Sequence, residues 1–204
     1  MTYLFSFLFP FLVMMLFLWE ISRLLGLRFK GITPTLGLAA ASALAVATPV
    51  CGLPLGRWLI SLNANFSIPL FAIVLSRITG NIFHRPLLDK RAVDTCAVFF
   101  LISGAVLYPM ALGIGPFDPY GAGWRFSWLF AGVLVLTIGL LIRKNRFGMV
   151  LVFAILAYDL KVLESSNFWD YIIDPLGVVW AALRLAWPRS FGPITPKENN
   201  RGMR

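Results

Sequence analysis

Long apolar runs separated by short charged segments are the feature that most limits how this chain can fold. The first run, residues 3–25, is interrupted only near its end, by Glu20 and Arg23. A helix needs about 20 mostly apolar residues to cross the hydrocarbon core of a bilayer. In the whole chain 59% of the residues are hydrophobic and 13% are charged, whereas soluble domains carry about 25% charged residues. The sequence therefore predicts an all-α fold, a polytopic transmembrane helical bundle.

Six or seven such runs follow one another along the chain. We expect membrane segments at 3–25, 33–51, 57–78, 93–114, 124–142, 147–163 and 168–187. The last run carries Asp170, Asp174 and Pro175 in its first third, so it either crosses the membrane or forms a re-entrant or interfacial helix. Residues 1–187 then make a single transmembrane domain, and the polar residues 188–204 are expected to form a disordered cytoplasmic tail.

The basic residues indicate how the bundle is oriented. With the amino terminus outside and seven crossings, all of the 18 basic residues except Arg57, Arg125 and Lys161 fall in or beside cytoplasmic regions. The opposite orientation would conflict with the excess of lysine and arginine in cytoplasmic loops. We therefore expect an integral protein of a bacterial inner membrane, with the amino terminus outside and the carboxyl terminus in the cytoplasm.

Composition also excludes several kinds of site. The only histidine, His84, lies in a charged loop, and the two cysteines fall near opposite membrane faces. No segment therefore offers a ligand set for zinc or haem, and we expect no metal or other cofactor. The pI of about 10.2 comes from charges at loop ends, which is not the basic patch of a nucleic-acid-binding protein.

The segment 158–174 concentrates polar residues in an apolar stretch. Asp159 and Lys161 lie inside an expected membrane segment, and Glu164, Asn167 and Asp170 follow them. Ionisable residues inside a membrane are costly and often functional. They can also be structural ties between helices, and the sequence leaves both interpretations open.

Four further polar residues are expected on the same outer side. Asn63 and Asn65 lie in the segment 57–78, whereas Arg57 and Arg125 lie at segment ends. Together with the preceding group they predict an outer polar cluster that lines a cleft. Within it we expect Asp159 to face protein, with Asn63, Asn65 or Arg125 as its partner.

A stripe of small residues marks the segment 33–51. Gly37, Ala41 and Ala45 recur every four residues, so they share one face of a helix. Small residues let two helices approach closely in lipid. The stripe predicts a helix-packing face, used either inside the fold or with a partner.

No nucleophile motif, phosphate-binding loop or metal set accompanies these residues, so we do not expect an enzyme. One hypothesis is a non-catalytic membrane subunit or accessory factor that packs against a partner membrane protein or a second copy, in cell-envelope biogenesis or transport. The other is a small carrier or channel whose outer cleft accepts a small solute, an ion or a lipid headgroup.

Overall fold

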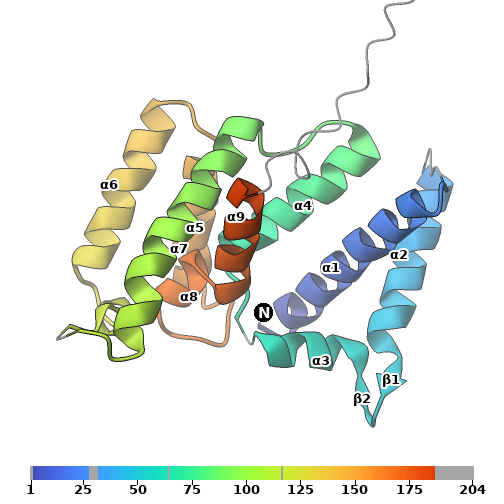
Figure 1. Ribbon diagram of the computed structural model, residues 1–204, viewed down its shortest axis with the longest axis horizontal. Coiled ribbons are helices and arrows are strands. Elements are labelled where there is room, and N and C mark those ends of the chain that lie inside the picture. Colours follow the sequence, from blue (N-terminus) through green and yellow to red (C-terminus); the bar gives the residue numbers. More distant parts are fainter. Residues whose placement is uncertain (1, 28–31, 64, 116, 187–204) are drawn as a thin grey trace, which may run out of the picture.

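The computed structural model describes residues 2–27, 32–63, 65–115 and 117–186, which form helices apart from one two-stranded hairpin (Figure 1). The elements are α1 (Thr2–Leu24), α2 (Ile32–Ala47), β1 (Pro49–Val50), β2 (Leu53–Pro54), α3 (Leu55–Leu62), α4 (Ile68–Phe83), α5 (Lys90–Ala111), the 3₁₀ helix η1 (Pro119–Gly123), α6 (Trp128–Ile142), α7 (Phe147–Asp159), α8 (Trp169–Ile172) and α9 (Pro175–Ala186). The expected all-α fold is confirmed. The expected tail, 188–204, lies outside the described residues.

Within the described residues two helices are long and apolar enough to cross a membrane, α1 and α5. Helices α2, α4, α6 and α7 are apolar but shorter. The expected bundle thus contains fewer full-length helices than the hydropathy of the sequence suggests. Two of the expected segments are broken by helix starts inside an apolar run, and the helices of three others, α2, α6 and α7, are shorter than 18 residues.

The first break divides the expected segment 57–78. Helix α3 ends at Leu62, and α4 starts only after Ser67, whose hydroxyl accepts a hydrogen bond from the backbone N–H of Leu70. Serine favours the position before a helix because its side chain satisfies a backbone donor there. A proline follows within the first turn of α4, where its missing N–H costs nothing. A single helix over 57–78 is therefore wrong.

The second break divides the expected segment 168–187. The short helix α8 ends at Ile172, and α9 starts at Pro175 after an extended residue, Ile173. Asp174 caps α9 by accepting a hydrogen bond of 2.8 Å from the backbone N–H of Gly177. The last segment is therefore not one continuous helix.

Helix α9 packs closely against α5 (Figure 1). A Cβ atom added to Gly177 would lie 2.5 Å from the ring of the fully buried Phe100, and one added to Gly104 would lie 2.6 Å from Val178. Both positions therefore require glycine. The two helices run in opposite directions, since Arg184 near the end of α9 pairs with Asp94 near the start of α5.

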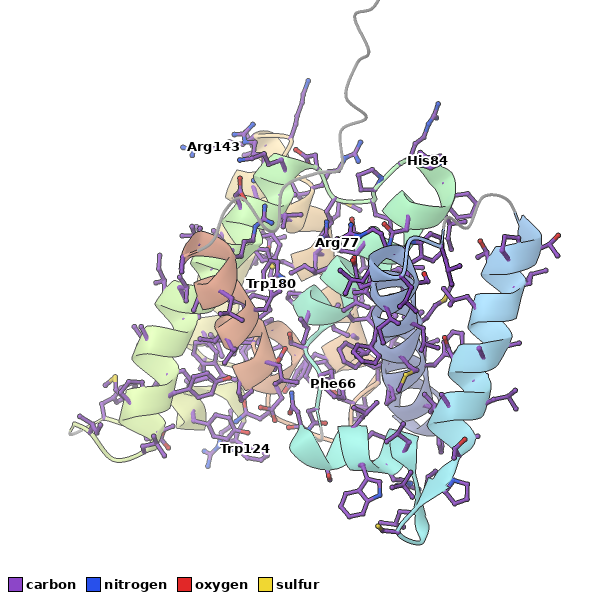
Figure 2. All side chains as sticks on the ribbon, turned by 45° about the vertical axis from the view of Figure 1, so that its right-hand side comes forward. Phe66, Arg77, His84, Trp124, Arg143 and Trp180 are labelled. Atoms are coloured by element: carbon purple, nitrogen blue, oxygen red, sulfur yellow. The ribbon has the colours of Figure 1, made fainter. Side chains whose placement is uncertain are left out.

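The two ends of the bundle differ in character. Figure 2 places His84 and Arg143 at one end, which we call the basic end, and Trp124 at the other, the Trp124 end. Helices α1, α4 and α9 all run towards the basic end (Figure 1). The hairpin β1–β2 and α3 lie at the Trp124 end, where the Phe9 ring of α1 stacks on Phe66 at 3.8 Å between centroids.

Other boundaries differ by a few residues from those expected. Helix α2 ends at Ala47 because the hairpin follows, with Cys51 and Gly52 in left-handed conformations at its turn. Helix α7 ends at Asp159, and Lys161 takes a positive φ of 49° just beyond it. Helix α6 starts after Ser127, whose hydroxyl accepts from the N–H of Leu129.

Candidate functional site

The most deeply buried charged side chain in the described part of the chain belongs to Asp174, which is 2% exposed. Its carboxylate accepts hydrogen bonds from the hydroxyl of Ser67 and, at 3.2 Å, from the backbone N–H of Ser67. It also accepts from the N–H of Gly177. The first turns of α4 and α9 therefore meet at one carboxylate, and the positive ends of two helices stabilise its negative charge. We call Ser67 and Asp174 the helix-start junction.

A second polar group joins η1 to the segment before α8. The side-chain amide of Asn167 donates to the carbonyl of Tyr120 at 3.0 Å, and its oxygen accepts from the N–H of Trp169 at 2.9 Å. The phenol of Tyr120 donates to Asp170 at 3.0 Å. We call this group, which comprises Asn167, Asp170 and Tyr120, the outer tie.

The outer tie is tightly packed as well as hydrogen-bonded. The indole N–H of Trp169 donates to the carbonyl of Pro119 at 2.8 Å, and a Cβ atom at Gly123 would overlap the side-chain oxygen of Asn167. Partial burial, followed by the charge of Asp170, raises the pKa of Tyr120 to about 12. The phenol therefore stays protonated and keeps donating to the carboxylate at neutral pH. A group whose polar atoms bond one another in this way holds segments together rather than receiving a ligand.

The expected outer cluster comes together only in part. Asn167 and Asp170 belong to the outer tie, and Asn65 accepts from the N–H of Ser165 at 3.4 Å. Asn63 accepts from the N–H of Asn65 at 3.3 Å, while its amide nitrogen is buried with no hydrogen-bond partner. Asn63 thus bonds locally between α3 and α4, whereas Asn65 bonds the segment before α8.

The charged members of that cluster stay apart. Five side chains are exposed and form no ion pair or hydrogen bond with one another in the described residues: Asp159, Lys161, Glu164, Arg57 and Arg125. The expected contacts of Asp159 with Asn63, Asn65 or Arg125 are therefore wrong. The reason is that α7 ends at Asp159, which leaves the carboxylate at the helix end, while Asn65 bonds Ser165 and Asn63 bonds Asn65. Arg57 instead lies 5.8 Å from the ring centroid of Phe7.

The small-residue stripe of α2 faces away from the rest of the chain. Gly37 and Ala41 are exposed and Ala45 is half-buried, and a Cβ at Gly37 would meet nothing within 4 Å. The buried face of α2 is instead formed by Thr35, Leu38, Ser42 and Val46. Of the two expected uses of the stripe, packing inside the fold is therefore wrong, because other side chains of α2 occupy that interface.

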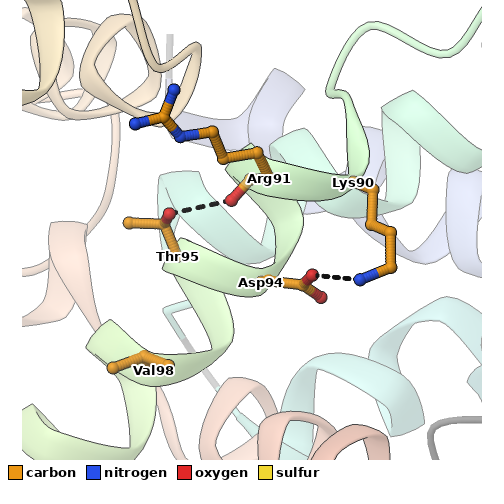
Figure 3. Close-up of a pocket in the computed structure, with 5 residues that line it drawn as sticks. All are labelled: Lys90, Arg91, Asp94, Thr95 and Val98. Carbon is orange, nitrogen blue, oxygen red and sulfur yellow. Dashed lines mark hydrogen bonds and ion pairs between the residues drawn. The ribbon is translucent and has the colours of Figure 1, made fainter. Parts of the chain in front are cut away.

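Charged side chains at the basic end form a small network. Asp94 accepts from Arg184 of α9 at 2.7 Å and from Lys90 at 2.8 Å. Lys90, Arg91, Asp94, Thr95 and Val98 line a hollow of about 600 Å³. Figure 3 shows these five side chains along the start of α5. All these residues come from the first turns of α5, so the hollow is a helix surface and not an enclosed site.

Comparisons with known proteins add no functional information. No family model, curated protein or solved structure matches the chain. The function must therefore be argued from this chain alone.

Three residues of the helix-start junction and the outer tie are not among the site residues expected from the sequence: Ser67, Asp174 and Tyr120. A signal for the first two exists in the sequence, because each precedes a proline by one or two positions inside an apolar run. Serine or aspartate followed by proline is typical of a helix start. Nothing in the sequence alone pairs Tyr120 with Asp170, which lies 50 residues further along.

Proposed function

We propose that this protein is a non-catalytic integral membrane subunit or accessory factor, which packs against a partner membrane protein in cell-envelope biogenesis or transport. In this proposal six or seven hydrophobic segments lie in a bacterial inner membrane, with the basic end in the cytoplasm. The last crossing is made by α8 and α9 together, broken at Asp174.

One observation carries the proposal: the chain leaves the small-residue face of α2 uncovered. Gly37 and Ala41 are exposed, although this kind of stripe is typical of close helix contacts in lipid. Intramolecular packing therefore does not explain the stripe, whereas a helix from another protein or a second copy would.

The polar residues favour this function over a carrier or channel. The polar side chains of the outer tie are bonded to one another, and the exposed charges around it do not converge. A carrier needs polar groups that face a shared binding space. In addition, the described residues contain no group of three or more histidine, cysteine or acidic side chains placed to hold a metal.

Site-specific photocrosslinking tests the proposal. A photoreactive residue at position 41 should give a crosslink to one discrete protein, recovered in stoichiometric amount after purification in mild detergent. The matched control is position 43, since Ala43 is also exposed on α2 but points to another side. Ala41→Leu should reduce recovery of the partner, whereas Ala43→Leu should not.

Two results would contradict the proposal. The first is that photoreactive residues at positions 41 and 43 both crosslink only to lipid. The second is solute uptake by liposomes that contain the purified chain alone, which would favour the carrier.

A further inference from the structure

An apolar cavity of about 240 Å³ lies between α1, α3, α4 and α9. Phe9 and Val13 of α1, Leu70 and Val74 of α4, and Leu176 and Trp180 of α9 form most of its wall. Cavities with walls of this kind do not hold water well and accept apolar ligands. The chemistry of the wall therefore fits a hydrocarbon chain.

Each helix of this wall continues into a charged residue on the same face. On α4 the row Leu70 and Val74 leads to Arg77, with spacings of four and three residues, which place side chains on one face of a helix.

The walls formed by α9 and α1 also continue into a charged residue on the same helix face. On α9 the row Leu176 and Trp180 leads to Arg184, and on α1 Phe9 and Val13 are followed two turns later by Glu20.

Arg77, Arg184 and Glu20 all lie towards the basic end of the bundle. Helices α1, α4 and α9 run in the same direction, and Figure 2 places Phe66, Trp180 and Arg77 successively closer to the basic end. Arg77 lies within electrostatic range of Glu20, Arg23 and Arg184. The cavity is thus lined by apolar residues, and the three charged residues lie beyond this lining on the side of the basic end.

Among the three charged residues that follow the cavity wall, Arg77 is the one that forms no ion pair with another described residue. Glu20 is paired with Arg23 at 2.8 Å, and Asp94 is paired with Arg184 at 2.7 Å. Arg77 is half-buried, and no hydrogen bond or ion pair to its guanidinium exists among the described residues. A half-buried guanidinium about one helical turn beyond an apolar cavity favours an anionic partner.

We propose that this cavity binds an acidic phospholipid of the surrounding bilayer, with one acyl chain between α1 and α9 and the phosphate at Arg77. The proposal rests on the membrane placement stated above, but it does not depend on a partner protein. The guanidinium matches a phosphate by two parallel hydrogen bonds. The lipid would fill the space between the α1–α3 part of the fold and the α4–α9 part.

Quenching of tryptophan fluorescence tests this directly, because Trp180 lines the cavity. The purified full chain in mild detergent is titrated with phosphatidylglycerol whose acyl chains carry bromine, and separately with phosphatidylcholine of identical chains. We expect the acidic lipid to quench at a concentration about tenfold lower. Glycerol phosphate alone should neither quench nor compete at millimolar concentration.

Three variants locate the site. Trp180→Phe should remove the component quenched at low lipid concentration. Arg77→Gln should raise the midpoint for the acidic lipid about tenfold, as loss of a hydrogen bond to a charged group implies. The matched control is Arg85→Gln, which removes an exposed charge at the same end and should leave the midpoint unchanged.

The proposal is overturned if wild-type protein shows equal midpoints for the two lipids, a comparison that needs no variant to fold. It is also overturned if Trp180→Phe retains the full quenching, or if Arg77→Gln behaves like Arg85→Gln. The assay contains no partner protein, so its failure is distinct from failure of the photocrosslinking.

Discussion

The carboxylate of Asp174 accepts hydrogen bonds from both the hydroxyl and the backbone N–H of Ser67, and so joins the starts of α9 and α4. Since the same carboxylate caps α9 through Gly177, one side chain fixes where two helices begin.

Loss of this carboxylate should destabilise the protein. We expect Asp174→Ala to lower the free energy of unfolding by about 2–4 kcal/mol, since it removes a helix cap and leaves buried donors unsatisfied. The control is Asp89→Ala, because Asp89 precedes α5 without a side-chain cap hydrogen bond and its loss should change little. Unfolding in detergent, followed by circular dichroism, measures both. Equal effects of the two substitutions would contradict the role given to Asp174.

A methyl group between α5 and α9 should also be costly. Gly177→Ala places a Cβ 2.5 Å from the buried ring of Phe100, so we expect a loss of about 1–3 kcal/mol. Gly37→Ala, where a Cβ meets nothing within 4 Å, should be neutral or slightly stabilising because alanine favours helices. The same unfolding assay distinguishes the two substitutions, and a neutral Gly177→Ala would show that α9 does not pack closely on α5.

The helical class of the fold follows from hydropathy, because each apolar run is too long and too continuous for a surface strand. The Glu20–Arg23 pair also follows from the sequence, since residues three apart lie on one face of a helix, and the two side chains pair at 2.8 Å. Hydropathy does not reveal the helix breaks at Ser67 and Asp174, because the average hydropathy of a segment does not change when a capping residue starts a new helix inside it. The outer cluster is predicted only from the depth at which its residues are expected to lie in the membrane. Depth does not show which side chains point towards one another.

The orientation of the bundle can be tested with fusions. Reporters of location placed after Lys90, Lys144 and Arg204 should all report the cytoplasm, because the basic residues gather in these regions. A reporter after Trp124 should report the external side, since Figure 2 places that residue at the other end from Arg143. An external signal at Lys144 would refute this orientation.

The outer tie predicts a dependence on alkaline pH. The pKa of Tyr120 is raised to about 12, first by burial and then by Asp170. A phenol whose folded pKa exceeds its unfolded value of about 10 stabilises the fold below pH 10, and that contribution disappears as the pH rises towards 12. We expect wild type to exceed Tyr120→Phe in stability at pH 7–9, with the difference vanishing near pH 12.

Absorbance at the tyrosinate band checks the assignment. The difference between wild type and Tyr120→Phe should show one phenol that titrates near pH 12, and Asp170→Asn should shift this titration towards pH 10. A Tyr120 titration near pH 10 in the wild-type protein would contradict both the partial burial of the phenol and its contact with Asp170.

The helix-start junction also sets an order of assembly. Ser67 and Asp174 are 107 residues apart in the sequence, so the acceptor of Ser67 is synthesised only after most of the chain has left the ribosome. Until then the first turn of α4 lacks the carboxylate that fixes it in the bundle. A nascent chain cut before residue 174 therefore cannot complete α4 in its final position, and closure of the fold waits for the last helix.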